Sequence, residues 1–347
     1  MSPVGKRVTI RSLLPSILAA VLMPGVLRAA EVSDPNSPRV ASLSIQPSRI
    51  DPAAKDDTLM PKSGELTEGN AATFYTKAIK ALPKDLDMYP VWGWLKTPLQ
   101  DLPRGQAQMV MTRVKATLDL LHQGARCRSC KWPRFTPEAT ASGEAEYRHL
   151  TCLLCIKARL EITRGQYDEA LDTIRTGLAV SKHVGEAPSI MQGRIGVSMA
   201  SVSLLPLEDL AQAKNAPNLY RAFHALPRPL VDMEKAIASD EISQVAGTVM
   251  KQQVEGLYEK LRATMKQLDA NVAALECVET LRHFAAGHDG RLPAKLSDIA
   301  DLQIPSNPTT DKPFTYRVEG SKAILEPSVP KGGLPLHSTR YEITVTH

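Results

Sequence analysis

The sequence predicts a mainly α-helical protein, an irregular α-α helical array followed by a small α+β C-terminal module with a short antiparallel hairpin. Three observations predict this class. Residues 71–288 are rich in Ala, Leu, Lys, Glu, Gln and Met and contain few alternating runs of β-branched residues. Glycines and prolines interrupt that pattern at short intervals. After residue 288, turns and two short strand-like runs replace it.

The composition excludes two broad classes of protein. Of 347 residues, 43% are hydrophobic, 23% charged and 5% aromatic, which excludes a fully disordered chain and a polytopic membrane protein. The formal net charge is +5. Four basic residues and no acid lie in the first 30 positions, so the remainder carries about +1. We therefore expect no nucleic-acid partner.

Residues 1–30 are typical of a signal peptide. A basic start precedes an uncharged, largely apolar run over residues 12–27, and small residues follow at Ala29 and Ala30. Two prolines break that run, which is shorter than the roughly 20 apolar residues that span a bilayer. We expect export to the periplasm or cell envelope, cleavage near Ala29 or Ala30, and membrane contact only through an uncleaved leader.

Residues 31–69 are predicted to be a disordered tether. Five prolines are interleaved there with Ser, Asp and Lys, and apolar periodicity is not apparent. A tether of this kind holds a folded domain away from a membrane or serves as a passive spacer.

Residues 70–270 are predicted to form the helical array. Gly165 separates two helices, so residues 143–183 should form a helical hairpin. Gly and Ser recur in the helix after Pro188 at spacings that favour close helix packing over a ligand-facing surface. The expected helices cover residues 70–82, 104–124, 143–164, 166–183, 187–213, 216–225 and 240–287.

Two stretches of the array resemble known families. The hairpin resembles a tetratricopeptide repeat at Leu154, Ala158, Gly165, Tyr167, Ala170, Ile174, Gly177 and Leu178. The runs 165–171, 183–188, 215–220 and 225–230 are similar to an uncharacterised family of exported bacterial proteins. The first resemblance implies a helical, tetratricopeptide-like fold. The second implies no activity.

Residues 271–347 are predicted to hold the end of a long helix and the α+β module. A stop at Gly287, a Gly-x-Leu-Pro turn and a hairpin around Gly320 resemble the globular part of type II secretion pseudopilins over residues 271–327. That resemblance implies loops able to hold calcium, for which Asp289, Asp298 and Asp311 are candidate ligands. Capping or surface roles suit them better. We expect truncation after Asp289 to leave the array folded.

Four cysteines form the one group of residues in the sequence whose spacing indicates possible chemistry. Cys127 and Cys130 make one Cys-x-x-Cys pair, Cys152 and Cys155 make a second, and 21 residues lie between the two pairs. Such spacing suits a four-cysteine zinc site, whereas an exported protein favours disulfides, and basic neighbours of the first pair would suit a redox dithiol. The fourth interpretation is that the four cysteines are inert thiols. We expect disulfide bonding between the pairs in preference to zinc, and a buried Cys277.

The spacings that common catalytic motifs need do not occur in the sequence. The leading hypothesis is therefore a non-catalytic exported scaffold or binding module for a protein or cell-envelope partner, without a cofactor. The alternative is a thiol-disulfide oxidoreductase or a zinc-dependent protein centred on the cysteine pairs.

Overall fold

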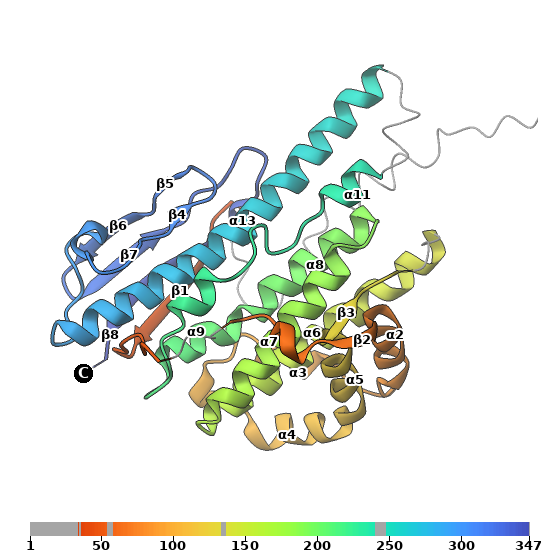
Figure 1. Cartoon of the computed structure of the whole chain (residues 1–347), viewed down its shortest axis with the longest axis horizontal. Coiled ribbons are helices and arrows are strands. Elements are labelled where there is room, and N and C mark those ends of the chain that lie inside the picture. Colours follow the sequence, from red (N-terminus) through yellow and green to blue (C-terminus); the bar gives the residue numbers. More distant parts are fainter. Residues whose placement is uncertain (1–33, 35, 54–57, 133–136, 240–247, 347) are drawn as a thin grey trace, which may run out of the picture. The chain divides into compact units, whose positions relative to one another are not determined.

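The computed structural model describes residues 34, 36–53, 58–132, 137–239 and 248–346 (Figure 1). The expected signal peptide and its cleavage site lie outside the described residues. From Asp34 onward the chain forms one compact unit. It is mainly helical with a small sheet near the C-terminus, as the sequence predicts.

The first helices surround Tyr75, which is fully buried. The expected helix over residues 104–124 is two helices, because the backbone at Val114 leaves the helical conformation at φ −99° and ψ 13°. The elements of this part are β2 (Thr67–Asn70), α2 (Ala71–Ala81), α3 (Tyr89–Trp94), α4 (Arg104–Arg113), α5 (Lys115–Ala125) and β3 (Cys127–Ser129). Strands β2 and β3 pair in parallel.

The helical hairpin is present, formed by α6 (Pro137–Thr163) and α7 (Tyr167–Gly185). Gly165 turns the chain with a positive φ of 70°. Helix α8 (Ile190–Ser203) then crosses α7 so closely that a Cβ on Gly196 would lie 2.3 Å from the Cα of Gly185. The small residues of α8 therefore allow close packing, as expected.

The remaining helices lead to one long helix. Pro206 divides the expected helix over residues 187–213, because a proline lacks the N–H that a continuous helix needs and fits the first turn of a new one. The elements are α9 (Leu205–Gln212), α10 (Tyr220–His224), α11 (Glu234–Ala238) and α13 (Thr248–Gly287). Cys277 on α13 is fully buried, as predicted.

A four-stranded sheet packs with α13 in the larger core (Figure 1). Its order is β1-β8-β7-β6. The hairpin around Gly320 is confirmed as β6 (Thr315–Glu319) and β7 (Lys322–Glu326). The other strands are β1 (Arg39–Ile45), β8 (Thr339–Val345), and a separate short pair, β4 (Ser306–Asn307) and β5 (Lys312–Pro313).

Strand β1 corrects the expectation of a disordered tether. It pairs in parallel with β8, from Arg39 opposite Thr339 to Ile45 opposite Val345. Ala41, Leu43 and Ile45 are buried while the residues between them face outward. The sequence contains this alternation of apolar and polar residues between two of its prolines. It is the signal that could have predicted the strand.

The expected division at residue 270 does not separate two cores. The larger core contains Leu178 and Leu207 from the helical array together with Phe314, Leu325 and Ile343 from the C-terminal module. Helix α13 runs without a break across the expected division. The array and the module therefore share apolar packing.

Arg282 of α13 ties distant segments to the end of this helix. Its side chain is fully buried and forms an ion pair with Glu279 at 2.8 Å. The guanidinium also donates to the carbonyl oxygens of Gln46, Ala216 and Pro217 at 2.9–3.0 Å. A buried guanidinium is tolerated because each of these acceptors offsets part of its desolvation cost.

Candidate functional site

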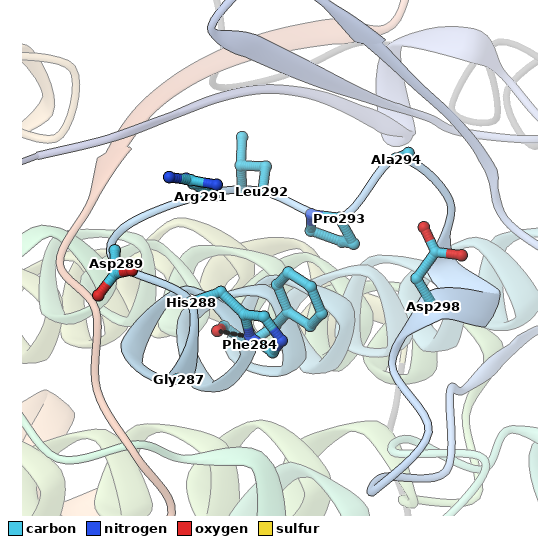
Figure 2. A pocket seen from close by; sticks show the side chains of 9 residues that line it. All are labelled: Phe284, Gly287, His288, Asp289, Arg291, Leu292, Pro293, Ala294 and Asp298. Atoms are coloured by element: carbon cyan, nitrogen blue, oxygen red, sulfur yellow. Dashed lines mark hydrogen bonds between the residues drawn. The ribbon is translucent and has the colours of Figure 1, made fainter.

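An open pocket of about 320 Å³ lies at the C-terminal end of α13 (Figure 2). Its wall opposite the helix is the loop that leads to the short 3₁₀ helix η4 (Leu296–Asp298). Side chains lining it include Phe284, His288, Asp289, Arg291, Pro293 and Asp298. This volume is at the lower end of the range for small-ligand sites.

Two stacked rings form the helix side of the pocket. The ring centroids of Phe284 and His288 are 3.7 Å apart, with 7° between the planes. His288 Nδ1 lies 2.8 Å from the carbonyl oxygen of Phe284. Since a carbonyl oxygen only accepts, Nδ1 carries the proton and Nε2 remains an acceptor in the neutral ring. No described residue donates a hydrogen bond to that Nε2.

Charged groups lie on two sides of these rings. Figure 2 shows Asp298 at one side, with Asp289 and Arg291 together at the other. One oxygen of Asp298, Oδ2, accepts the backbone N–H of Lys295 at 2.8 Å, which caps η4. The other carboxylate oxygen has no hydrogen-bond partner among the described residues. Asp298 therefore has a local structural role and spare acceptor capacity.

The end of α13 is anchored by His283, one turn before the pocket. Its Nδ1 accepts the backbone N–H of Ile50 at 3.1 Å, and its Nε2 lies 2.9 Å from Asp301. The imidazole holds the pKa of Asp301 below its usual range by hydrogen bonding. The segment after β1 and the segment after η4 are thus both fixed to the helix end that forms the pocket.

The three candidate calcium ligands do not gather at one point. Asp289 and Asp298 line the pocket, whereas Asp311 lies in the turn between β4 and β5, where its N–H donates to Asn307 O at 2.8 Å. Asp289 and Asp311 adopt positive φ angles of 52° and 56°. Among the described residues, no group of three His, Cys, Asp or Glu side chains is placed to hold a metal ion.

The first cysteine pair lies near Tyr75 and α6. Cys127 begins β3, and the Cys130 thiol lies 3.9 Å from the carbonyl oxygen of His183. Burial raises the pKa of the Cys130 thiol to about 12. An extended run of three residues separates Cα atoms by roughly 10 Å. A disulfide needs about 4.4–6.8 Å, so bonding within this pair would require β3 to unfold.

The second cysteine pair lies inside α6. Cys152 and Cys155 are both buried. Burial raises the pKa of Cys152 to about 12 and that of Cys155 well above its usual value. Cys152 belongs to the same core cluster as Cys127, and Cys130 packs against that cluster.

Cys152 lies on a different side of α6 from Tyr147. Trp132, two residues after Cys130, meets Tyr147 of α6 edge-on at a centroid distance of 5.9 Å. Cys152 is five residues after Tyr147, which places it roughly 140° further round the helix. All five cysteines carry free thiols in the structure. A disulfide between the pairs stays a prediction, as does zinc.

Tyr75 and His183 form a polar contact beside the first cysteine pair that was not predicted from the sequence. Tyr75 Oη and His183 Nδ1 are 2.6 Å apart. Trp132 Nε1 donates to the carbonyl oxygen of His183 at 2.7 Å. Burial lowers the pKa of His183 to about 4, with Lys182 adding to the effect. The contact links α2 to α7, which the sequence did not reveal because 108 residues separate the two side chains.

One stretch of the described chain, Ile190–Gln212, is long and apolar enough to cross a membrane by length and composition. It corresponds to α8 and α9, and 61% of its apolar window is buried in the protein. A core helix passes the same test, so the packing described above accounts for its composition.

Comparisons with known proteins leave the chain without an assigned family. Neither family models, nor curated proteins, nor solved structures give a match. The resemblances to tetratricopeptide repeats, to exported bacterial proteins and to pseudopilins therefore remain predictions from the sequence.

Proposed function

We propose that this protein is an exported, non-catalytic binding module for a protein or cell-envelope partner, and that the pocket at the end of α13 receives part of that partner. One observation supports this proposal above others. His288 Nε2 and one oxygen of Asp298 keep unused hydrogen-bonding capacity around an accessible ring pair. By contrast, Arg282 and Glu279 form hydrogen bonds with other groups inside the protein.

The pocket is held in place before any ligand arrives. Buried Arg282 and half-buried His283 bind the segments around Gln46, Ile50 and Asp301 to the last turns of α13. A binding site built on a fixed helix end loses little conformational entropy when it is occupied. This favours recognition of a partner over a large rearrangement.

The alternative function, centred on the cysteines, has less support. The thiolate is the reactive form in thiol exchange and in metal binding, and burial raises the pKa of Cys130 and Cys152 to about 12. Free-thiol counting and zinc analysis of the purified mature protein separate the two functions. Five free thiols without zinc favour the binding module, whereas one stoichiometric zinc or a reactive dithiol favours the alternative.

Export is tested at the N-terminus. We expect the protein to be found in the cell envelope or outside the cell, beginning near Glu31 after removal of the leader. N-terminal sequencing that returns Met1 would contradict cleavage. Recovery of all the protein from the cytoplasm would contradict export.

Filling the pocket tests the binding function. Ala294 lines the pocket and is exposed, whereas Ala300 is exposed and does not line it. We expect Ala294→Phe to reduce specific capture of the partner from an envelope fraction by about tenfold, as loss of a central contact does. The matched variant Ala300→Phe should capture as much as the unmodified protein.

Quantitative mass spectrometry of the captured fractions gives the result, with thermal unfolding to verify that both variants fold. Equal capture by Ala294→Phe and Ala300→Phe would contradict a binding role for the pocket. So would the absence of any protein or glycan enriched over a denatured control.

A further inference from the structure

We infer that the pocket at the end of α13 recognises a cationic side chain of the partner, the guanidinium of an arginine. This inference rests on the proposed function and deepens it by naming the chemistry that the pocket accepts. Three features of the described residues carry it: the helix end, the stacked rings and the distribution of charge.

The helix end favours a cation. Helix α13 runs for 40 residues and ends at Gly287, directly beneath the pocket. The C-terminal end of a helix carries a partial negative charge, which stabilises nearby cations and disfavours anions. An anionic ligand would have to oppose this field.

The stacked rings offer a flat face to a planar cation. Phe284 and His288 stack with nearly parallel ring planes, 7° apart, and both line the pocket. A guanidinium stacks on aromatic faces and is more weakly hydrated than an ammonium, so it loses less on leaving water. This favours arginine over lysine as the guest.

Among the side chains that line the pocket, carboxylates outnumber guanidinium groups. Asp289 and Asp298 contribute −2 and Arg291 contributes +1, whereas the guanidinium of Arg49 lies outside this lining, against Gly287 at the helix end. Figure 2 shows Asp289 and Arg291 on one side of the rings and Asp298 on the other. Among the described residues no ion pair joins Arg291 to either carboxylate, and the free oxygen of Asp298 can accept an N–H from a guanidinium.

Asp298 permits a variant that removes charge and keeps the fold. In Asp298→Asn the amide oxygen can still accept the N–H of Lys295, so the cap of η4 is preserved. Asp289→Asn is the matched control, since it removes the same charge from the side of the pocket that holds Arg291.

The experiment uses Nα-acetyl-L-arginine amide as the probe and Nα-acetyl-L-citrulline amide as its uncharged analogue. Backbone amide shifts of the isotope-labelled mature protein are followed by NMR during titration. We expect the arginine probe to shift residues 284–298 selectively, with the citrulline probe at least about fivefold weaker. Asp298→Asn should weaken binding about three- to fivefold, and Asp289→Asn less than about twofold, as for exposed charge pairs.

Two results would overturn the inference: citrulline binding as tightly as arginine, or Asp298→Asn binding arginine like the unmodified protein. Absence of shifts in residues 284–298 would also overturn it. If Ala294→Phe reduces partner capture as expected in that case, the proposed function stands and only the cationic guest is wrong. If capture survives Ala294→Phe, the proposed function fails whatever the probe does.

Discussion

Two regions of this protein are held together in different ways. Helices α6, α7 and α8 pack against neighbours that follow directly in the chain, around a turn at Gly165 and a glycine crossing at Gly196. Helix α13 and the sheet depend on partners far away in sequence: the side chains of Ser44 and Thr344 meet across 300 residues, and Arg282 reaches Gln46 across 236.

This difference teaches which part of a fold a single sequence reveals. Local helix pairs leave a periodic pattern with a break between its halves, and that pattern can be read directly. A strand pair from opposite ends of the chain leaves two short patterns, neither of which indicates the other. The candidate pocket depends on the second kind of contact.

The largest expected effect comes from removing the C-terminal module. Truncation after Asp289 deletes Phe314, Leu325, Tyr341 and Ile343 from the larger core and leaves β1 without its partner. We expect the truncated chain to lose cooperative unfolding and much of its helical circular dichroism. This reverses the expectation from sequence that the array would fold alone. A truncated chain that unfolds cooperatively at the original temperature would show that the helices do not need the module.

The next largest effect is a difference in stability between a variant of a buried ion pair and a variant of a surface ion pair. Arg282→Met removes a fully buried guanidinium and leaves Glu279 without its counter-charge, which typically costs about 3–5 kcal/mol. Arg317→Met removes an exposed guanidinium that pairs with Glu319 and Glu326, and exposed ion pairs contribute little to stability. Urea unfolding of both variants measures the difference. Equal loss of stability would contradict the role of Arg282.

A smaller effect depends on pH and belongs to the helical region. Burial against Tyr75 and Cys130, beside Lys182, lowers the pKa of His183 to about 4. The unfolded chain binds a proton near pH 6.5, so the folded state loses stability as pH falls from about 6.5 through 4. The loss should approach about 3 kcal/mol below pH 4.

Comparing the unmodified protein with His183→Gln gives the contribution of His183 to the pH dependence of stability. The Gln side chain can form a hydrogen bond with Tyr75 and does not titrate in this range. The difference in free energy of unfolding between the two proteins should change between pH 7 and pH 4.5. A constant difference over that range would mean that His183 is not the group that titrates.

Much of the helical region was predictable. The turn at Gly165, the close packing of α8 and the burial of Cys277 all follow from residue type and spacing. The breaks at Val114 and Pro206 were missed. Pro206 stands among leucines, and its effect as a first-turn residue is distinguishable from an interior kink only once the packing is known.

Less of the candidate site was predictable. His288 and Asp298 were visible as single residues, but the pocket forms because His283, Ile50 and Asp301 fix two loops to the end of α13. Phe284 and His288 are four residues apart across a helix end, a spacing that brings rings together. The cysteine spacing drew attention to a different place, where burial suppresses the thiolate.

The most direct test of the shared fold is cross-linking of β1 to β8. Ser42 and Glu342 are paired in the parallel register and lie on the outward face of the sheet. Oxidation of the double variant Ser42→Cys/Glu342→Cys should join the two strands, as peptide mapping by mass spectrometry would show. The control Val40→Cys/Thr344→Cys is four residues out of register and should not cross-link. Cross-linking of the control alone, or of neither pair, would contradict the parallel pairing of β1 with β8.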